Sequence, residues 1–132
     1  RSRFMSAIDS LPNANYLGVV VGKDRENLLL NSDIFLFPSF YDTEALPISM
    51  LEALSCGCFV IATDHNYLPD LLPAENSLVP IRSPKEILRT IGDYVLLDEA
   101  MRLQRSRSNI SYAHLNYSHQ KYTATMNLLL NE

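Results

Sequence analysis

The chain has 132 residues, a length that suits one domain or most of one, and hydrophobic residues make up 47% of it, which is enough for a packed core. Its net charge of −4 and its isoelectric point of about 5.3 argue against a nucleic acid as the main partner. No apolar run approaches the roughly 20 residues of a membrane-spanning helix, so no transmembrane segment is predicted. The chain begins without Met in a predicted helix over 1–9, and we therefore interpret it as a piece of a longer protein.

The predicted elements alternate short apolar strands with amphipathic helices, a pattern that favours an α/β fold with a parallel sheet. In chain order they are a strand over 14–18, a loop over 19–25, a short helix over 26–31, a strand over 33–37, a helix over 47–55, a strand over 58–62, a helical turn over 67–72, a strand over 77–80, and helices over about 84–97, over about 99–114 and from Ser118 onward. The strands over 33–37 and 58–62 are apolar on both faces, which is typical of central parallel strands. A capping box, Ser83-Pro84-Lys85-Glu86, predicts the start of one helix.

Two cysteines, Cys56 and Cys58, are separated only by Gly57. A disulfide across a single residue would be badly strained, and two ligands do not complete a zinc site. We therefore expect two buried, reduced thiols, as in a cytoplasmic protein, and no metal site.

The helix predicted over 47–55 begins at the sheet edge where open α/β proteins bind their ligands. Its first backbone N–H groups, at Ile48 and Ser49, and its dipole make an anion site that suits a phosphate. The alternative is a helix N-terminus that simply meets water, and the pattern alone does not decide between the two.

Glu52 lies in the middle of this helix, and the helix is predicted to be buried because its other side chains are apolar nearly all round. A buried carboxylate needs hydrogen-bond donors, and a sugar diol supplies two of them. The alternative is a carboxylate at the helix edge that is solvated or paired with a Lys or Arg. Glu44 lies eight residues earlier, in a loop from which it can reach a sugar on the far side of the phosphates.

The central stretch reads DIFLFPSFYDTEALPISMLEALSCGCFVIATD: a strand ending in Pro-Ser, Glu44, seven residues, Glu52-Ala, a Cys-Gly stop, and a strand ending in Ala-Thr-Asp. This order and spacing resemble the signature of glycosyltransferase family 4, a large group of retaining enzymes with the GT-B fold. Tyr16-Leu17-Gly18 resembles the Phe-Leu-Gly turn of that family, and Tyr117-Ser118-His119 resembles the start of its last helix.

The resemblance implies a Rossmann-like parallel sheet flanked by helices, with residues 1–132 forming a partial C-terminal nucleotide-sugar-binding domain that lacks its first strands. It implies transfer of a hexose from a nucleoside-diphosphate sugar, with retention, to a glycan or lipid acceptor held by an N-terminal domain. It also implies that no metal or other cofactor is needed. The setting that it implies is polysaccharide assembly in the cytoplasm or at the inner membrane face.

The resemblance also assigns roles to particular residues. Glu44 is the catalytic acid that orients the transferred sugar, and Glu52 accepts hydrogen bonds from the ribose. The N–H groups of Ile48 and Ser49 hold the diphosphate. The remaining donor-binding residues are Leu46 and, in the loop that flanks the nucleobase, Gly18, Val20 and Arg25; for Arg25 a solvated loop cation is the alternative.

The chain departs from the family pattern at His65-Asn66-Tyr67, where Gly-Gly is common, and at Pro47, where Gly is common. We interpret His65 as a loop or capping histidine in preference to a base. A non-catalytic partner or regulatory domain with the same fold remains open, as does a sugar-nucleotide epimerase. Residues 1–132 alone are expected to be inactive in sugar transfer. The strand order of the family implies that the strand over 33–37 would be an unpaired edge without the missing strands, so we expect rearranged pairing, self-association or poor solubility.

Overall fold

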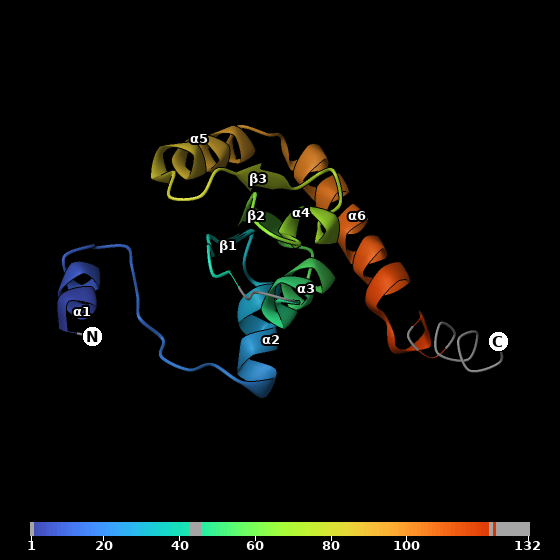
Figure 1. Ribbon diagram of the computed structural model, residues 1–132, viewed down its shortest axis with the longest axis horizontal. Coiled ribbons are helices and arrows are strands. Elements are labelled where there is room, and N and C mark those ends of the chain that lie inside the picture. The colour runs from blue at the N-terminus through green and yellow to red at the C-terminus, as the bar shows by residue number, and fades with distance from the viewer. Residues whose placement is uncertain (1, 43–45, 122, 124–132) are drawn as a thin grey trace.

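The structure is a computed structural model that describes residues 2–42, 46–121 and 123 (Figure 1). Its elements are, in chain order, α1 Ser2–Asp9, α2 Gly22–Leu30, β1 Ile34–Phe37, α3 Ile48–Ser55, β2 Phe59–Thr63, α4 Leu68–Leu71, β3 Ser77–Val79, α5 Pro84–Val95 and α6 Glu99–Tyr117. A further helical turn begins after Ser118, whose hydroxyl accepts a hydrogen bond from the Lys121 N–H at 3.2 Å, as the predicted cap requires.

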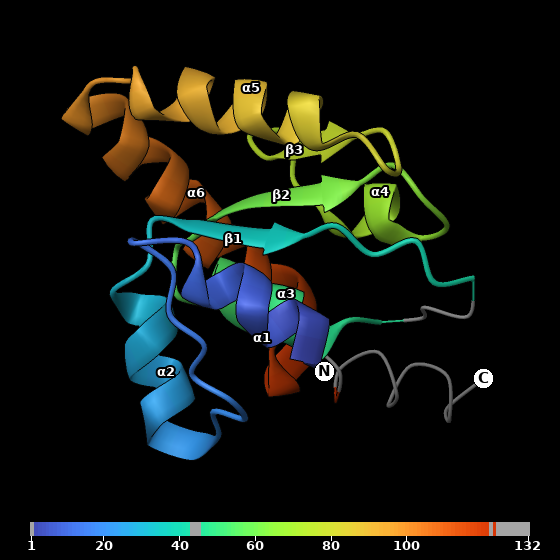
Figure 2. The same cartoon turned by 90° about the vertical axis from the view of Figure 1, so that its left-hand side faces the viewer.

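The three strands form a parallel sheet in the order β1-β2-β3. All residues of β2 are buried, because a central parallel strand is covered on both faces. Figure 2 shows α5 on one side of the sheet and α3 on the other. The predicted α/β architecture, a parallel sheet flanked by helices, is confirmed.

Alternate residues of β2 enter two separate hydrophobic clusters, as the two-residue period of a strand requires. Val60 and Ala62 pack in the cluster that includes α3 and part of α6. Phe59 and Ile61 pack in the cluster on the α5 side, where the Phe59 ring stacks on Tyr94 with the ring centroids 4.6 Å apart. The fully buried β2 thus joins the two halves of the core.

Two amide side chains connect α6 to β2. Asn109 is fully buried, and its Nδ2 donates to the Cys58 carbonyl at 2.8 Å. Asn76, which precedes β3, donates through Nδ2 to Asn109 Oδ1 at 2.8 Å and accepts from the Val60 N–H at 2.7 Å. These bonds satisfy polar groups that would otherwise be costly inside the core.

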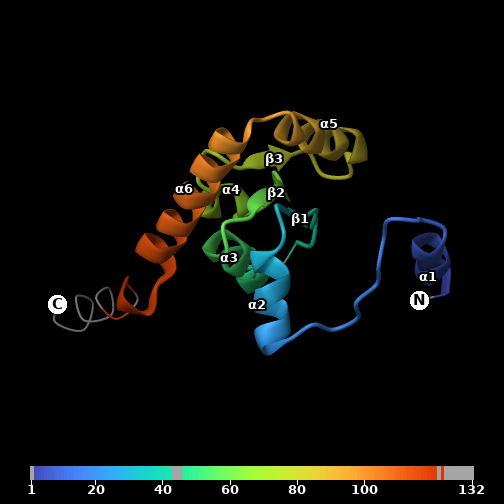
Figure 3. The same ribbon diagram turned by 180° about the vertical axis from the view of Figure 1, so that it is seen from behind.

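The predicted strand over 14–18 is wrong. These residues form an extended connection between α1 and α2, with Tyr16 and Leu17 about half exposed. Figures 1 and 3 show from opposite sides that this connection carries α1 away from the sheet. A strand needs a neighbour that satisfies its backbone groups, and within the described residues the three strands pair only with one another.

The predicted loop over 19–25 is wrong from Gly22 onward, because α2 already begins there. Lys23, Asp24 and Arg25 do not break a helix, and an acidic residue in the first turn interacts favourably with the helix dipole. This change moves Arg25 from a loop onto a helix.

The capping box predicted at the start of α5 is also wrong, although the helix does begin at Pro84. Ser83 makes no side-chain capping bond. The Glu86 carboxylate that would complete the box instead accepts from Arg89, whose Nη2 lies 2.9 Å from Glu86 Oε2.

Within the described part of the chain, β1 pairs with β2 alone and is an edge of the sheet. It is apolar throughout, and its Leu36 side chain is 42% exposed. An exposed apolar edge is a template for pairing with another chain.

We therefore expect the 132-residue chain to self-associate, so that its mass in sedimentation equilibrium rises above 15.0 kDa with concentration. Leu36→Lys should reduce this association, because a charged side chain on an edge strand opposes strand pairing. Leu88→Lys is the matched control, since Leu88 lies on α5 and is 71% exposed. A mass of 15.0 kDa at every concentration would contradict the expectation.

Candidate functional site

The carboxyl ends of β1 and β2 meet at one edge of the sheet, where open α/β proteins bind ligands. The chain leaves β1 at Phe37 and returns as α3, which begins at Ile48 with the buried Pro47 as its N-cap. The first helical hydrogen bond comes from the Met50 N–H to the Pro47 carbonyl at 2.9 Å. The N–H groups of Ile48 and Ser49 precede this bond, so they are available to an anion in the way that helix N-termini allow.

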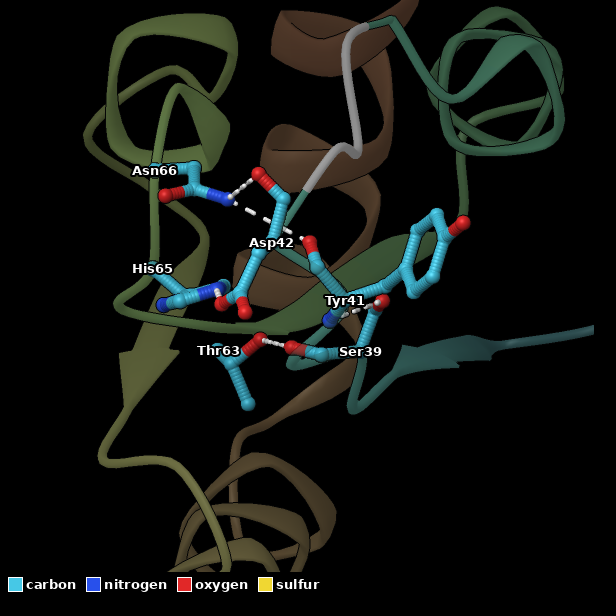
Figure 4. Close-up of polar contacts among 6 residues, drawn as sticks. All are labelled: Ser39, Tyr41, Asp42, Thr63, His65 and Asn66. Atoms are coloured by element: carbon cyan, nitrogen blue, oxygen red, sulfur yellow. Dashed lines mark hydrogen bonds and ion pairs between the residues drawn. The ribbon is translucent and has the colours of Figure 1, made fainter.

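Hydrogen bonds tie the loop after β1 to the loop after β2 (Figure 4). The Thr63 hydroxyl donates to the Ser39 carbonyl. The Asn66 amide donates to the carbonyls of Tyr41 and Asp42, at 3.3 and 3.1 Å. These contacts hold the described loop up to residue 42, on the N-terminal side of Glu44.

His65 lies in the loop after β2, as interpreted from the sequence. Its Nε2 is 3.5 Å from Asp42 Oδ1, so it adds to the contacts between the two loops. Glu44, the predicted catalytic acid, lies outside the described residues, and its place at the site stays a prediction.

A cavity of about 580 Å³ opens between α2, α3 and the end of α6, a volume within the usual range for small-molecule sites. Its lining residues come from all three helices: Gly22, Arg25, Glu26, Leu29, Ile48, Leu51, Glu52, Ser55, Cys56 and Tyr117. Three residues predicted for donor binding, Arg25, Ile48 and Glu52, therefore share one cavity.

The two oxygens of the Glu52 carboxylate have different surroundings. Oε1 accepts a hydrogen bond from Arg25 Nη2 at 2.5 Å, so the pairing that the sequence left open is present. Oε2 is buried and has no hydrogen-bond partner among the described residues. A buried acceptor without a donor costs about 1–3 kcal/mol, which marks Oε2 as an oxygen that a ligand hydroxyl would stabilise.

The prediction that α3 is buried nearly all round is wrong for one side of the helix. Met50, Ala53 and Leu54 are fully buried, whereas Ile48 is 66% exposed and the Glu52 side chain is 29% exposed. The difference arises because only one side of α3 packs on the sheet and α6, while the other side lines the cavity.

Four predicted donor-binding residues do not line this cavity: Gly18, Val20, Leu46 and Ser49. Gly18 and Val20 belong to the connection before α2, and Leu46 and Ser49 are exposed near the start of α3. The N–H group of Ser49 still lies at the helix N-terminus, so its predicted role depends on an anion at that end.

Tyr117 and Cys56 also line the cavity, although no pattern in the sequence assigned them a role there. Burial, followed by the charges of Glu26 and Glu52, raises the pKa of the Cys56 thiol. Burial and the hydrogen bond with Tyr112 raise the pKa of Tyr117 to about 12. Both groups are therefore neutral near pH 7.

Both cysteines are free, but only Cys58 is buried, so the expectation of two buried thiols is wrong for Cys56. The reason is that Cys56 is the C-cap of α3 and lines the cavity.

Among the described residues, no group of His, Cys, Asp and Glu side chains is arranged to hold a metal ion. None of the described helices combines the length and the apolar character needed to cross a membrane.

The chain matches the family described as "Glycosyl transferases group 1" over residues 5–113, and it belongs to that family. The match includes the whole sheet, α3 and the cavity except Tyr117.

Three curated relatives illustrate the similarity. A protein of Escherichia coli K12 named as a colanic acid biosynthesis glycosyltransferase, WcaL, is 29% identical over 64% of this chain and 23% of its own length. The O-antigen chain mannosyltransferase B of Escherichia coli is 40% identical over 43% of this chain and 14% of its own length. One component of the human phosphatidylinositol N-acetylglucosaminyltransferase is 40% identical over 48% of this chain and 12% of its own length. The chain thus spans less than a quarter of each of these relatives.

Asn66 contributes to stability through its side-chain hydrogen bonds, and its backbone is left-handed with a φ of 50°. We expect two substitutions to measure these two effects separately. Asn66→Gly should cost about 1 kcal/mol of unfolding free energy, because it removes exposed amide hydrogen bonds. Asn66→Ala should cost roughly 1 kcal/mol more, because a Cβ is disfavoured at this φ. Urea unfolding measures the unfolding free energy of both variants. Equal stabilities of the Gly and Ala variants would contradict the expected cost of a Cβ at this φ.

Proposed function

We propose that this chain is the donor-binding part of a retaining hexosyltransferase that takes a nucleoside-diphosphate sugar as donor and a glycan or lipid as acceptor. Membership of the group 1 glycosyltransferases supports sugar transfer as the reaction. The names of the relatives refer to colanic acid, an O-antigen chain and phosphatidylinositol, which supports a glycan or lipid acceptor here.

The observation that carries the proposal is the unpartnered Oε2 of Glu52, which the described residues leave without a donor in a helix that lines a 580 Å³ cavity. A ribose has two neighbouring hydroxyl groups that donate hydrogen bonds, and a carboxylate only accepts them. Because Oε2 is covered, a hydroxyl reaches it after a small side-chain adjustment of the kind that often accompanies binding. Glu52 is thereby the proposed anchor of the nucleoside.

The diphosphate of the donor fits the N-terminus of α3. There the helix dipole and the backbone N–H groups of Ile48 and Ser49 favour negative charge. These groups are one turn from Glu52 on the same helix, so ribose and diphosphate bind to adjacent parts of α3. We propose that they stabilise the leaving diphosphate without a metal ion or other cofactor.

Glu44 is proposed to act on the sugar, whose ring gains positive charge in the transition state. The described residues before it, up to Asp42, are held by the contacts of Asn66 and Thr63, and α3 follows Glu44 in the sequence. A carboxylate held there would stabilise the developing charge more strongly than the ground state. We propose polysaccharide or glycolipid assembly at the cytoplasmic face of a membrane as the setting, and the names of the relatives support the part on glycan or glycolipid assembly.

We expect Glu52→Gln and Glu44→Gln to affect different steps in the full-length protein. The donor is first identified as the nucleotide sugar that raises Tm most in a panel of UDP-, GDP- and ADP-sugars. Glu52→Gln should then weaken nucleoside diphosphate binding by about 5–150-fold, the equivalent of about 1–3 kcal/mol, and raise KM with a smaller effect on kcat. Glu44→Gln should lower kcat and leave diphosphate affinity nearly unchanged.

Calorimetric titration and steady-state kinetics measure these effects. Gln keeps the size of the side chain, so unchanged thermal unfolding is the control for each variant. The opposite pattern would reverse the assignment of the two acids. If neither variant changes binding or rate, the proposal fails and a non-catalytic partner domain becomes the better interpretation.

A further inference from the structure

We infer that Arg25 is a positioning residue of the donor site, which holds the Glu52 carboxylate by one oxygen and leaves the other, covered oxygen without a partner, so that a small movement brings it to the ribose. The inference rests on the proposed function, since it takes Glu52 as the group that binds the ribose. The sequence placed Arg25 in a loop beside the nucleobase, and the structure places it on α2 against Glu52.

The contact joins residues that are 27 positions apart and belong to different helices, α2 and α3. Arg25 Nη2 lies 2.5 Å from Glu52 Oε1, so the two groups form a charge-assisted hydrogen bond. Arg25 and Glu52 line the same cavity, and their side chains are 45% and 29% exposed. The pair is thus at the cavity wall, where a ligand can reach it.

The contact uses one carboxylate oxygen. A forked arginine–carboxylate pair would occupy both oxygens, whereas here Oε2 has no partner in the described part of the chain. A glutamate side chain also rotates freely unless something holds it, and ordering such a side chain during binding lowers the affinity. Arg25 reduces that loss in advance by holding the carboxylate close to its bound position before the ribose arrives.

The charges around the cavity favour a neutral hydroxyl over a phosphate as the ligand group that contacts Arg25 and Glu52. Arg25 is accompanied by two acids in the lining, Glu26 and Glu52, so the carboxylates outnumber the cation. Their negative charge is felt at Cys56, where both acids contribute to raising the pKa of the thiol. A phosphate would be repelled by these carboxylates, whereas a hydroxyl donates to them.

The test combines a variant with a change in the ligand, using the full-length protein and calorimetric titration. The probes are the nucleoside diphosphate of the identified donor and its 2′,3′-dideoxy form, which lacks the two ribose hydroxyls. In the wild type, we expect the dideoxy form to bind about tenfold more weakly, the equivalent of one to two net hydrogen bonds. In Arg25→Gln this difference should shrink to about twofold, because the ribonucleotide loses affinity and the dideoxy form does not.

Arg25→Lys is the conservative variant: its single ammonium can reach Oε1 but lacks the fixed geometry of a guanidinium, so it should retain part of the difference. Lys23→Gln is the matched control, because it removes the same charge from the same helix at a residue outside the cavity lining. It should leave the affinities of both probes unchanged.

Equal weakening of both probes by Arg25→Gln would overturn the inference, since it would show a direct contact with phosphate or base, or a general structural role. A wild type that binds both probes equally would instead refute the role of Glu52 in the proposed function. A preserved tenfold difference in Arg25→Gln, with Glu52→Gln abolishing it, would keep the proposed function and overturn the inference about Arg25.

Discussion

The burial of β2 on both faces is the constraint on which the other features depend. A strand with every residue buried must satisfy its backbone through neighbouring strands and cover its side chains with helices. β1 and β3 provide the neighbours, α3 and α6 cover one face, and α5 covers the other. Parallel pairing brings the carboxyl ends of β1 and β2 to one edge. The loop contacts and the start of α3 follow from that arrangement.

Helix α3 has two chemically different sides, and this division connects stability to binding. Met50, Ala53 and Leu54 complete the core against β2, so they fix the helix in place. Ile48, Leu51 and Glu52 line the cavity, so their side chains can contact a ligand. The carboxylate of Glu52 therefore projects from a rigid support and is held by Arg25 on the neighbouring helix.

The sequence predicted well the elements whose structure is set by local pattern. The two-sided apolar strands, the helix between them and the Gly57 stop all appear within a residue or two of their predicted positions, because burial and helix termination are encoded locally. The segment over 14–18 was misjudged because whether an apolar run becomes a strand depends on a partner elsewhere. The surroundings of Glu52 also depend on residues elsewhere in the chain. The sequence offered either a buried or a paired carboxylate, and in the structure Oε1 is paired with Arg25 while Oε2 is buried without a partner among the described residues.

The sequence left open that Glu52 pairs with a Lys or Arg but did not identify Arg25, because nothing in the order of residues shows that α2 places Arg25 beside α3. Tyr117 reached the cavity wall for a similar reason, from the far end of a 19-residue helix. The predicted roles of the remaining site residues depend on a bound donor and stay predictions: Glu44, Leu46, Ser49, Gly18 and Val20.

The amide contacts between α6 and β2 have a consequence for the order in which the chain can fold during synthesis. Asn109 and Ala113 are buried against elements made much earlier, so the α3 face of the sheet cannot be completed until α6 has emerged from the ribosome. Until then the nascent chain carries an apolar strand with one face open. Intermediates of this kind attract chaperones and are prone to aggregate. A late-made helix thus sets the time at which the α3 face of the sheet is closed.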